Sequence, residues 1–200
     1  MKKGITKILS ACVFAFVVFL AAGTQSKAAV NMGVKQTGAG SSYVDLAWDA
    51  QLGAGHYHTQ FSQDGKNWID MDNSSSPSES VYNLTQGASY YARVVAYKGS
   101  HYTGTHVMIG VSETAIVSTK PTEVSGLTQT AAGVNSVSMS WNASAGAASY
   151  VIYGYINYNW TQIGTSATNS ATITGVAATT STRFSVAAVK NVTGGTVTGD

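Results

Sequence analysis

Four histidines are the side chains of this sequence best suited to bind a metal ion. His56 and His58 stand two residues apart, and His101 and His106 follow in a later segment that we expect to be a long loop. Alternation along a strand would place His56 and His58 on one outer face, where a zinc site would need further ligands. Two solvent-exposed histidines on a polar face explain the same spacing, and we therefore predict no metal site.

Acidic residues suggest calcium binding or paired-carboxylate catalysis, and neither interpretation is supported. The segment DMDNSSSPSE at 70–79 resembles a calcium loop but lacks the glycine at its sixth position and the glutamate at its twelfth. Asp45 and Asp49 share an outer face of their expected strand, with no sign of a cleft between them. No Gly-x-Ser-x-Gly turn marks a nucleophilic serine, and the single cysteine, Cys12, lies close to the N-terminus. We therefore predict a non-catalytic chain without a cofactor.

Aromatic residues form the strongest candidate for a binding surface. In YVIYGYINYNW at 150–160, Tyr150 and Ile152 are expected to point inward, and Tyr153 and Tyr155 outward. Exposed rings on a sheet can stack on sugar rings or anchor a protein partner, although tyrosine is also common in strands for its packing alone. The candidate binding face comprises Tyr91, Arg93, Tyr97, His56, His58, Tyr153 and Tyr155.

Residues 1–28 have the pattern of a secretory signal peptide. Three lysines precede the apolar run at 8–23, and Ser26 and Ala28 are the small residues of a cleavage site. The run is shorter than the roughly 18 or more residues of a membrane span, so we expect no span in the mature chain. We therefore predict a secreted, extracellular protein of bacterial type, either free or associated with the cell wall.

Removal of this segment changes the charge balance of the chain. Four of the 11 basic residues lie within it, which leaves seven basic residues against nine acidic ones. Such a sparse, nearly neutral surface argues against nucleic acid or an anionic membrane as the partner. Cys12 is removed as well, so the mature chain has no disulfide and depends on its hydrophobic cores for stability.

The rest of the sequence consists of two similar halves. Each half alternates apolar and polar residues over short runs, which is typical of half-buried antiparallel strands, and no stretch shows a helical period. We predict an all-β chain of two tandem immunoglobulin-like β-sandwiches. The segments shared by the two halves, in chain order, are VDLAWDA at 44–50 with VSMSWNA at 137–143, Trp68 with Trp160, and VVA at 94–96 with VAA at 186–188.

The segment LTQGASYYARVVA resembles the fibronectin type III module. Leu84, Gly87 and Tyr90 match the Leu-x-Pro-Gly-x-x-Tyr turn of that family, with Gln86 in place of the proline. The resemblance implies that Tyr90 is the tyrosine-corner residue, whose hydroxyl bonds to nearby backbone. In the second half the aligned residue is Thr182, so we expect a weaker corner there.

The expected organisation is a signal peptide at 1–28, a first domain at 29–119 and a second at 120–200. Pro121 marks a short linker, which implies limited motion between the domains. Few residues follow the second VAA segment, so either the chain is a piece of a longer protein and the last strand is missing, or that strand is short with an exposed edge; we favour the first. The predicted structural core contains Trp48, Trp141, Tyr57, Tyr150, Leu84 and Tyr90.

Two classes of function fit this organisation, and the fold alone does not choose between them. The first, which we favour, is a non-catalytic interaction or spacer module with an adhesive role, whose ligand is a protein or polysaccharide surface. The alternative is an accessory segment of a secreted polysaccharide- or peptide-degrading hydrolase whose catalytic domain lies outside this chain. A free-standing carbohydrate-binding protein is a third hypothesis, which rests only on the tyrosines.

Overall fold

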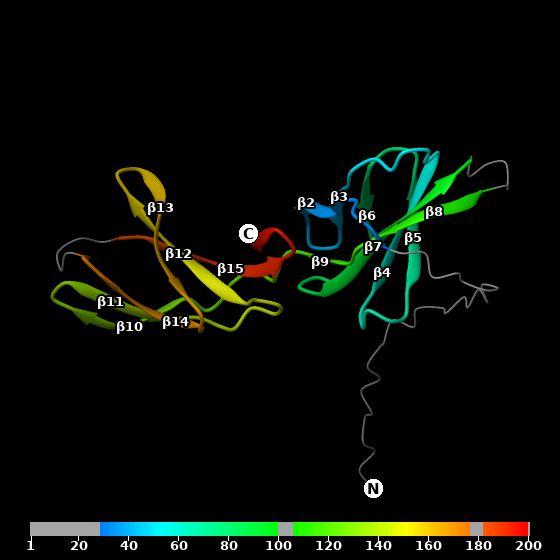
Figure 1. The fold of residues 1–200 in the computed structure, drawn as a ribbon. Coiled ribbons are helices and arrows are strands. Elements are labelled where there is room, and N and C mark those ends of the chain that lie inside the picture. The colour runs from blue at the N-terminus through cyan, green and yellow to red at the C-terminus, as the bar shows by residue number, and fades with distance from the viewer. Residues whose placement is uncertain (1–28, 100–105, 177–181, 200) are drawn as a thin grey trace, which may run out of the picture.

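The computed structural model describes residues 29–99, 106–176 and 182–199, which form two separate β-sandwiches placed end to end (Figure 1). The predicted signal peptide and His101 lie outside the described residues. No helix in the described ranges is long and apolar enough to cross a membrane. The predicted fold class, all-β with two tandem immunoglobulin-like sandwiches, is confirmed.

The first unit packs a three-stranded sheet against a larger one. The small sheet has the order β2-β3-β6, and the large one has the order β1-β8-β7-β4-β5 with β9 also paired to β7. Residues in β3 alternate between fully buried and partly exposed, as the sequence period of two predicts. The strands are β1 (Ala29–Val30), β2 (Lys35–Ala39), β3 (Val44–Ala47), β4 (His56–Ser62), β5 (Ile69–Ser74), β6 (Ser78–Val81), β7 (Ser89–Lys98), β8 (Val107–Ser112) and β9 (Ala115–Ser118).

The second unit repeats this plan with fewer strands. Its small sheet has the order β10-β11-β14, and its larger sheet has the order β13-β12-β15-β16. A two-residue turn joins β12 to β13, and both of its residues, Asn157 and Tyr158, have positive φ angles, as a type I′ hairpin requires. The strands are β10 (Thr128–Gly133), β11 (Ser136–Ser140), β12 (Ser149–Ile156), β13 (Asn159–Ser166), β14 (Ser170–Thr174), β15 (Phe184–Val192) and β16 (Gly195–Thr198).

Each unit encloses its own hydrophobic core around a buried tryptophan. In the first unit the rings of Trp48 and Tyr57 meet edge to face with centroids 5.4 Å apart, and in the second Trp141 and Tyr150 do the same at 5.3 Å. Both tyrosine hydroxyls accept a bond from a backbone N–H, that of Gln51 and that of Ser144 respectively. The matching Trp and Tyr positions of the two halves therefore form the same core contact in each unit. The other buried members are Met32, Val34, Val44, Leu46, Phe61, Val81, Leu84, Tyr90, Ala92, Val94, Ala96, Ala115 and Val117 in the first core, and Met139, Ile152, Ile173, Val186 and Ala188 in the second.

The turn that precedes β7 has the geometry that the fibronectin type III resemblance implies. The hydroxyl of Tyr90 accepts a hydrogen bond from the backbone N–H of Thr85 at 2.9 Å, and Leu84 is buried beside it. This bond fixes the crossover between the two sheets. The aligned Thr182 follows directly after residues outside the described ranges.

The second unit has a short strand, β16, at the position of β8 in the first unit. β16 has four residues and pairs antiparallel with β15, with Val189 opposite Thr198 and Val192 opposite Gly195. β16 pairs on one side only, so it is an edge of its sheet.

Candidate functional site

Five of the seven candidate face residues lie on the large sheet of the first unit, and the other two lie on the second unit. His56 and His58 come from β4, and Tyr91, Arg93 and Tyr97 from β7, to which β4 is paired. Tyr153 and Tyr155 come from β12 in the other sandwich. The predicted face is therefore two separate surfaces, each of which has to be judged on its own contacts.

The histidines of the first unit pack into an aromatic cluster. The rings of His56 and Tyr97 are stacked with centroids 5.2 Å apart, and Tyr97 also contacts His58 and, edge on, His106. The Nδ1 atom of His56 lies 3.0 Å from the carbonyl oxygen of Gly99, which implies a proton on that nitrogen. Only 3% of His56 is exposed, so the expectation of a solvent-exposed His56 was wrong. The cross-strand neighbour Tyr97 covers it, and burial in turn raises the pKa of the Tyr97 phenol.

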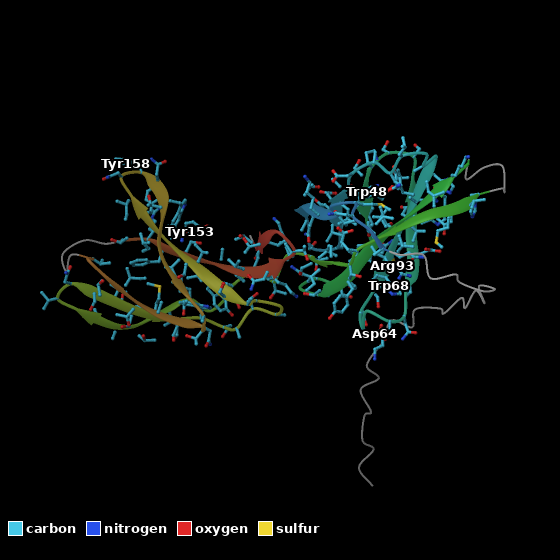
Figure 2. All side chains as sticks on the ribbon, viewed as in Figure 1. Trp48, Asp64, Trp68, Arg93, Tyr153 and Tyr158 are labelled. Carbon is cyan, nitrogen blue, oxygen red and sulfur yellow. The ribbon has the colours of Figure 1, made fainter. Side chains whose placement is uncertain are left out.

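Arg93 organises the other part of this surface through contacts within the first unit. Its Nε donates to Oε1 of Gln60 at 2.8 Å, and Nε2 of Gln60 donates to Oδ1 of Asp70 at 2.7 Å. The guanidinium carbon lies 4.0 Å from the ring centroid of Trp68, a cation–π contact (Figure 2). Burial lowers the pKa of Arg93, although a guanidinium remains charged at neutral pH. The donors and the ring on this face are thus already engaged by neighbours of the same unit.

The β12–β13 hairpin of the second unit presents its aromatic side chains to solvent. Tyr155 and Trp160 are directly opposite each other in the strand pairing, and their rings meet edge to face with centroids 5.3 Å apart. Trp160 is 51% exposed and Tyr158, at the tip, is 90% exposed. Tyr153 lies on the same strand face as Tyr155 and is half-buried; Figure 2 shows Tyr158 at the outer end of this hairpin.

Trp160 and Tyr158 are candidates that the sequence-based selection missed. The repeat aligns Trp160 with Trp68, so the signal for an aromatic at this place was available. The exposure of Trp160 depends on the side chains that the neighbouring strands place around it, and the alternation of a single strand does not reveal them. Tyr158 occupies a turn position with a φ of 64°, which is unusual for an aromatic residue.

Among the acidic residues considered for calcium binding or catalysis, Asp45 and Asp70 form hydrogen bonds with side chains of neighbouring strands. Oδ1 of Asp45 accepts a bond from the Ser80 hydroxyl at 2.6 Å, and Asp70 is bonded to Gln60. Burial and the nearby carboxylate of Asp72 raise the pKa of Glu79. Among the side chains in the described ranges, no group of three or more His, Cys, Asp or Glu residues is arranged to hold a metal ion.

A cleft of about 400 Å³ runs along the junction between the two units. It is bordered by two edge strands, β2 of the first unit and β16 of the second, and its lining residues are 36–39, Lys120 and 192–198. The lining consists of glycines, threonines, Gln36, Ala39, two valines and one lysine, without a nucleophile poised beside a base. The cleft is a consequence of how the two units meet.

Comparison with protein-family models gives no match, and comparison with curated proteins gives none either. Among solved structures the chain is similar to a two-domain fibronectin type III segment of chicken tenascin, with 16% identity, 83% of this chain and 95% of that chain covered, and a TM-score of 0.39. It is also similar to the FN1-FN3 domains of chicken CNTN1, with 15% identity, 85% and 66% covered, and a TM-score of 0.45. Both are tandem fibronectin type III segments, the family that the sequence resembles.

Proposed function

We propose that this chain is an exported, non-catalytic spacer and interaction module, in which two sandwiches are held in one fixed arrangement and present surface loops and sheet faces to a partner. The export part of the proposal is supported by the signal-peptide pattern of residues 1–28. The spacer part is supported by one observation, the direct bonding of the two units to each other.

Hydrogen bonds join the two units directly. The backbone N–H of Thr193 donates to the carbonyl of Ile116 at 2.8 Å, and the N–H of Ile116 donates to the Thr193 hydroxyl at 2.7 Å. The ammonium group of Lys190 donates to the carbonyl of Gly87, and burial lowers the pKa of this lysine. A turn of the second unit is thereby bonded to the edge of β9 in the first unit.

Two glycines allow the backbones to approach closely at the same place. Gly87 and Gly146 both have positive φ angles, 69° and 83°. A Cβ atom added to Gly146 would overlap the carbonyl of Gly87, and a Cβ atom added to Gly87 would lie 2.6 Å from the carbonyl oxygen of Ala145. The contact therefore requires the absence of a side chain on both turns.

The linker is bonded on both sides. The carbonyl of Lys120 accepts a bond from the N–H of Gly87 in the first unit at 2.9 Å. On the other side, the hydroxyl of Thr122 accepts a bond from the N–H of Ala145 at 2.8 Å, and the N–H of Thr122 donates to the carbonyl of Ala145. A hinge would need backbone groups that can rotate without losing partners, and these residues do not provide one.

The repeat supplies a matched test of this proposal. Gly53 is the counterpart of Gly146 in the first unit, with a φ of 82°, and a Cβ atom there would meet nothing within 4 Å. Alanine costs about 1 kcal/mol in backbone strain at either glycine, but only Gly146→Ala intrudes on the other unit. Spin labels on Leu52→Cys and Val134→Cys, both highly exposed, report the distance between the units.

We expect a single narrow distance distribution in the parent protein and in the Gly53→Ala variant, and a broadened one in the Gly146→Ala and Lys190→Ala variants. A broad distribution in the parent protein would show independently moving units and would contradict the spacer proposal.

A further inference from the structure

We propose that the β12–β13 hairpin of the second unit binds an uncharged polysaccharide chain, with Trp160 and Tyr155 as the surface on which a sugar ring stacks. This inference rests on the proposed interaction role and gives it a ligand class. It depends on a difference between two tryptophans at the same place in the two units.

Trp68 and Trp160 are aligned by the internal repeat; Trp68 immediately precedes the edge strand β5, and Trp160 lies near the start of the edge strand β13. In the first unit Arg93 lies over the Trp68 ring, which is only partly exposed. In the second unit the residue aligned with Arg93 is Ser185, because VVA at 94–96 matches VAA at 186–188. Ser185 is opposite Tyr153, and its side chain is too short to reach across β12 as Arg93 reaches across β4 to Trp68; Trp160 is 51% exposed.

Trp160 also contacts a second ring of the hairpin. Tyr155 contacts it edge to face at an interplanar angle of 62°, and the guanidinium of Arg183 lies 6.0 Å from the Tyr155 ring centroid. The contact between the two rings restricts their rotation, which reduces the side-chain entropy that binding would cost. An indole that is half exposed beside a second ring offers an aromatic surface on which the C–H face of a sugar can stack.

The polar groups beside the rings are neutral. Gln162 is paired with Tyr153 across the hairpin, and Ser185 is paired with Tyr153 on the other side; both are exposed. An amide and a hydroxyl can each donate and accept, which suits sugar hydroxyl groups. Within 122–176 and 182–199 the only residues with formal charge are Glu123, Arg183 and Lys190, and Lys190 is bonded at the junction.

This surface fits an uncharged chain better than the alternatives. An acidic polymer would meet a single guanidinium, that of Arg183, which already lies near the Tyr155 ring. A stable protein complex buries about 800 Å² on each partner, and the aromatic group here is confined to the width of a two-stranded hairpin. A narrow platform of rings with flanking neutral donors matches one chain of sugars.

Affinity electrophoresis of the full mature chain tests the proposal, with soluble hydroxyethyl cellulose, mannan and starch as uncharged probes and alginate as the polyanion. We expect at least one uncharged polysaccharide to retard the parent protein, and Trp160→Ala to weaken that binding at least tenfold. Ser185→Arg keeps the indole but introduces a guanidinium at the position from which Arg93 reaches Trp68 in the first unit, and we expect the same loss. Trp68→Ala removes the matched tryptophan of the first unit and should bind like the parent protein.

Circular dichroism of each variant in the near ultraviolet shows whether its fold is retained, and Ser185→Arg tests the inference should Trp160→Ala fail to fold. Retardation by none of the uncharged probes, or by alginate alone, would overturn the proposal. A dimer that sedimentation detects in the parent protein but not in Trp160→Ala would also overturn it, because the hairpin would then be a protein interface. The spin-label distances test the proposed function independently. A narrow distance distribution without retardation by an uncharged polysaccharide contradicts only the polysaccharide inference. Retardation together with a broad distance distribution contradicts only the fixed arrangement of the two units.

Discussion

Arg93 lies over the ring of Trp68, with its guanidinium carbon 4.0 Å from the ring centroid, and it reaches Gln60 with its Nε from the same position. One side chain on β7 thereby contacts β4 and the residue that immediately precedes β5. In the second unit the aligned residue is Ser185, and Trp160 of the hairpin is 51% exposed. The two repeats therefore share a scaffold and differ in whether their outer face is closed by its own side chains.

Removal of this contact should weaken the first unit. A cation–π contact at a partly exposed site contributes about 0.5–1 kcal/mol, and a hydrogen bond to a charged group contributes a similar or larger amount. We expect Arg93→Ser to lower the free energy of unfolding of the first unit by about 1–2 kcal/mol. Residue-resolved hydrogen exchange in β4 and β7 measures this loss, and exchange in β12 and β15 should not change. Equal protection in the parent protein and the variant would show that the contact contributes nothing.

The buried tyrosine hydroxyls of the two cores should also contribute to stability. The hydroxyl of Tyr57 accepts the N–H of Gln51, and that of Tyr150 accepts the N–H of Ser144. Phenylalanine at either position leaves a backbone donor without its partner, which costs about 1–3 kcal/mol. We expect Tyr57→Phe to destabilise only the first unit and Tyr150→Phe only the second. Tyr158→Phe serves as the control because 90% of that residue is exposed, and it should have no measurable effect.

The tryptophans at the centres of the cores should have the largest effect of any single substitution. Trp48 and Trp141 are 5% and 3% exposed, and each contacts a buried tyrosine ring. Truncation of a buried tryptophan to alanine leaves a cavity and costs about 3–5 kcal/mol, a large part of the stability of a small domain. We expect Trp48→Ala to unfold the first unit and Trp141→Ala the second, each at a lower denaturant concentration. Simultaneous loss of both units in one variant would contradict the presence of two separate cores.

The scaffold could be predicted from the sequence because its determinants are local. Alternation in VDLAWDA and VSMSWNA sets which residues of β3 and β11 face inward, and the repeat showed that the arrangement occurs twice. The corner at Tyr90 is encoded within seven residues, from Leu84 onward. Patterns of this kind fix the side of a sheet that a residue occupies.

The surface could not be predicted in the same way, because alternation says nothing about what covers an outward side chain. His56 points outward from β4 and is still buried, because the Tyr97 ring from β7 stacks on it. Trp160 is 51% exposed although its repeat partner Trp68 is covered by Arg93, a difference that the shared pattern of the two halves does not reveal. The junction depends on Gly87 and Gly146, which are distant in the sequence and meet only when both units have folded.

The turn between β4 and β5 should make stability depend on pH in the acid range. The carboxylate of Asp64 accepts hydrogen bonds from the backbone N–H groups of Asn67 and Lys66, the side-chain amide of Asn67 and the Ser62 hydroxyl. The two backbone bonds are the main cause that holds its pKa far below the ordinary value of 3.8. Because the folded protein lowers this pKa, the carboxylate stabilises the folded state above about pH 4 to 5, and this contribution is lost as the pH falls further.

We therefore expect Asp64→Asn to be less stable than the parent protein at pH 7, with a difference that shrinks steadily between about pH 4 and pH 2. Denaturant unfolding of both proteins over this range measures the difference and cancels the titration of other groups, including Glu79, whose raised pKa acts in the opposite direction. Asp49→Asn is a suitable control, because Asp49 is an exposed aspartate of the same unit outside this turn. A difference at Asp64 that stays constant down to pH 2 would show that the bonds to the turn do not depend on the charge of the carboxylate.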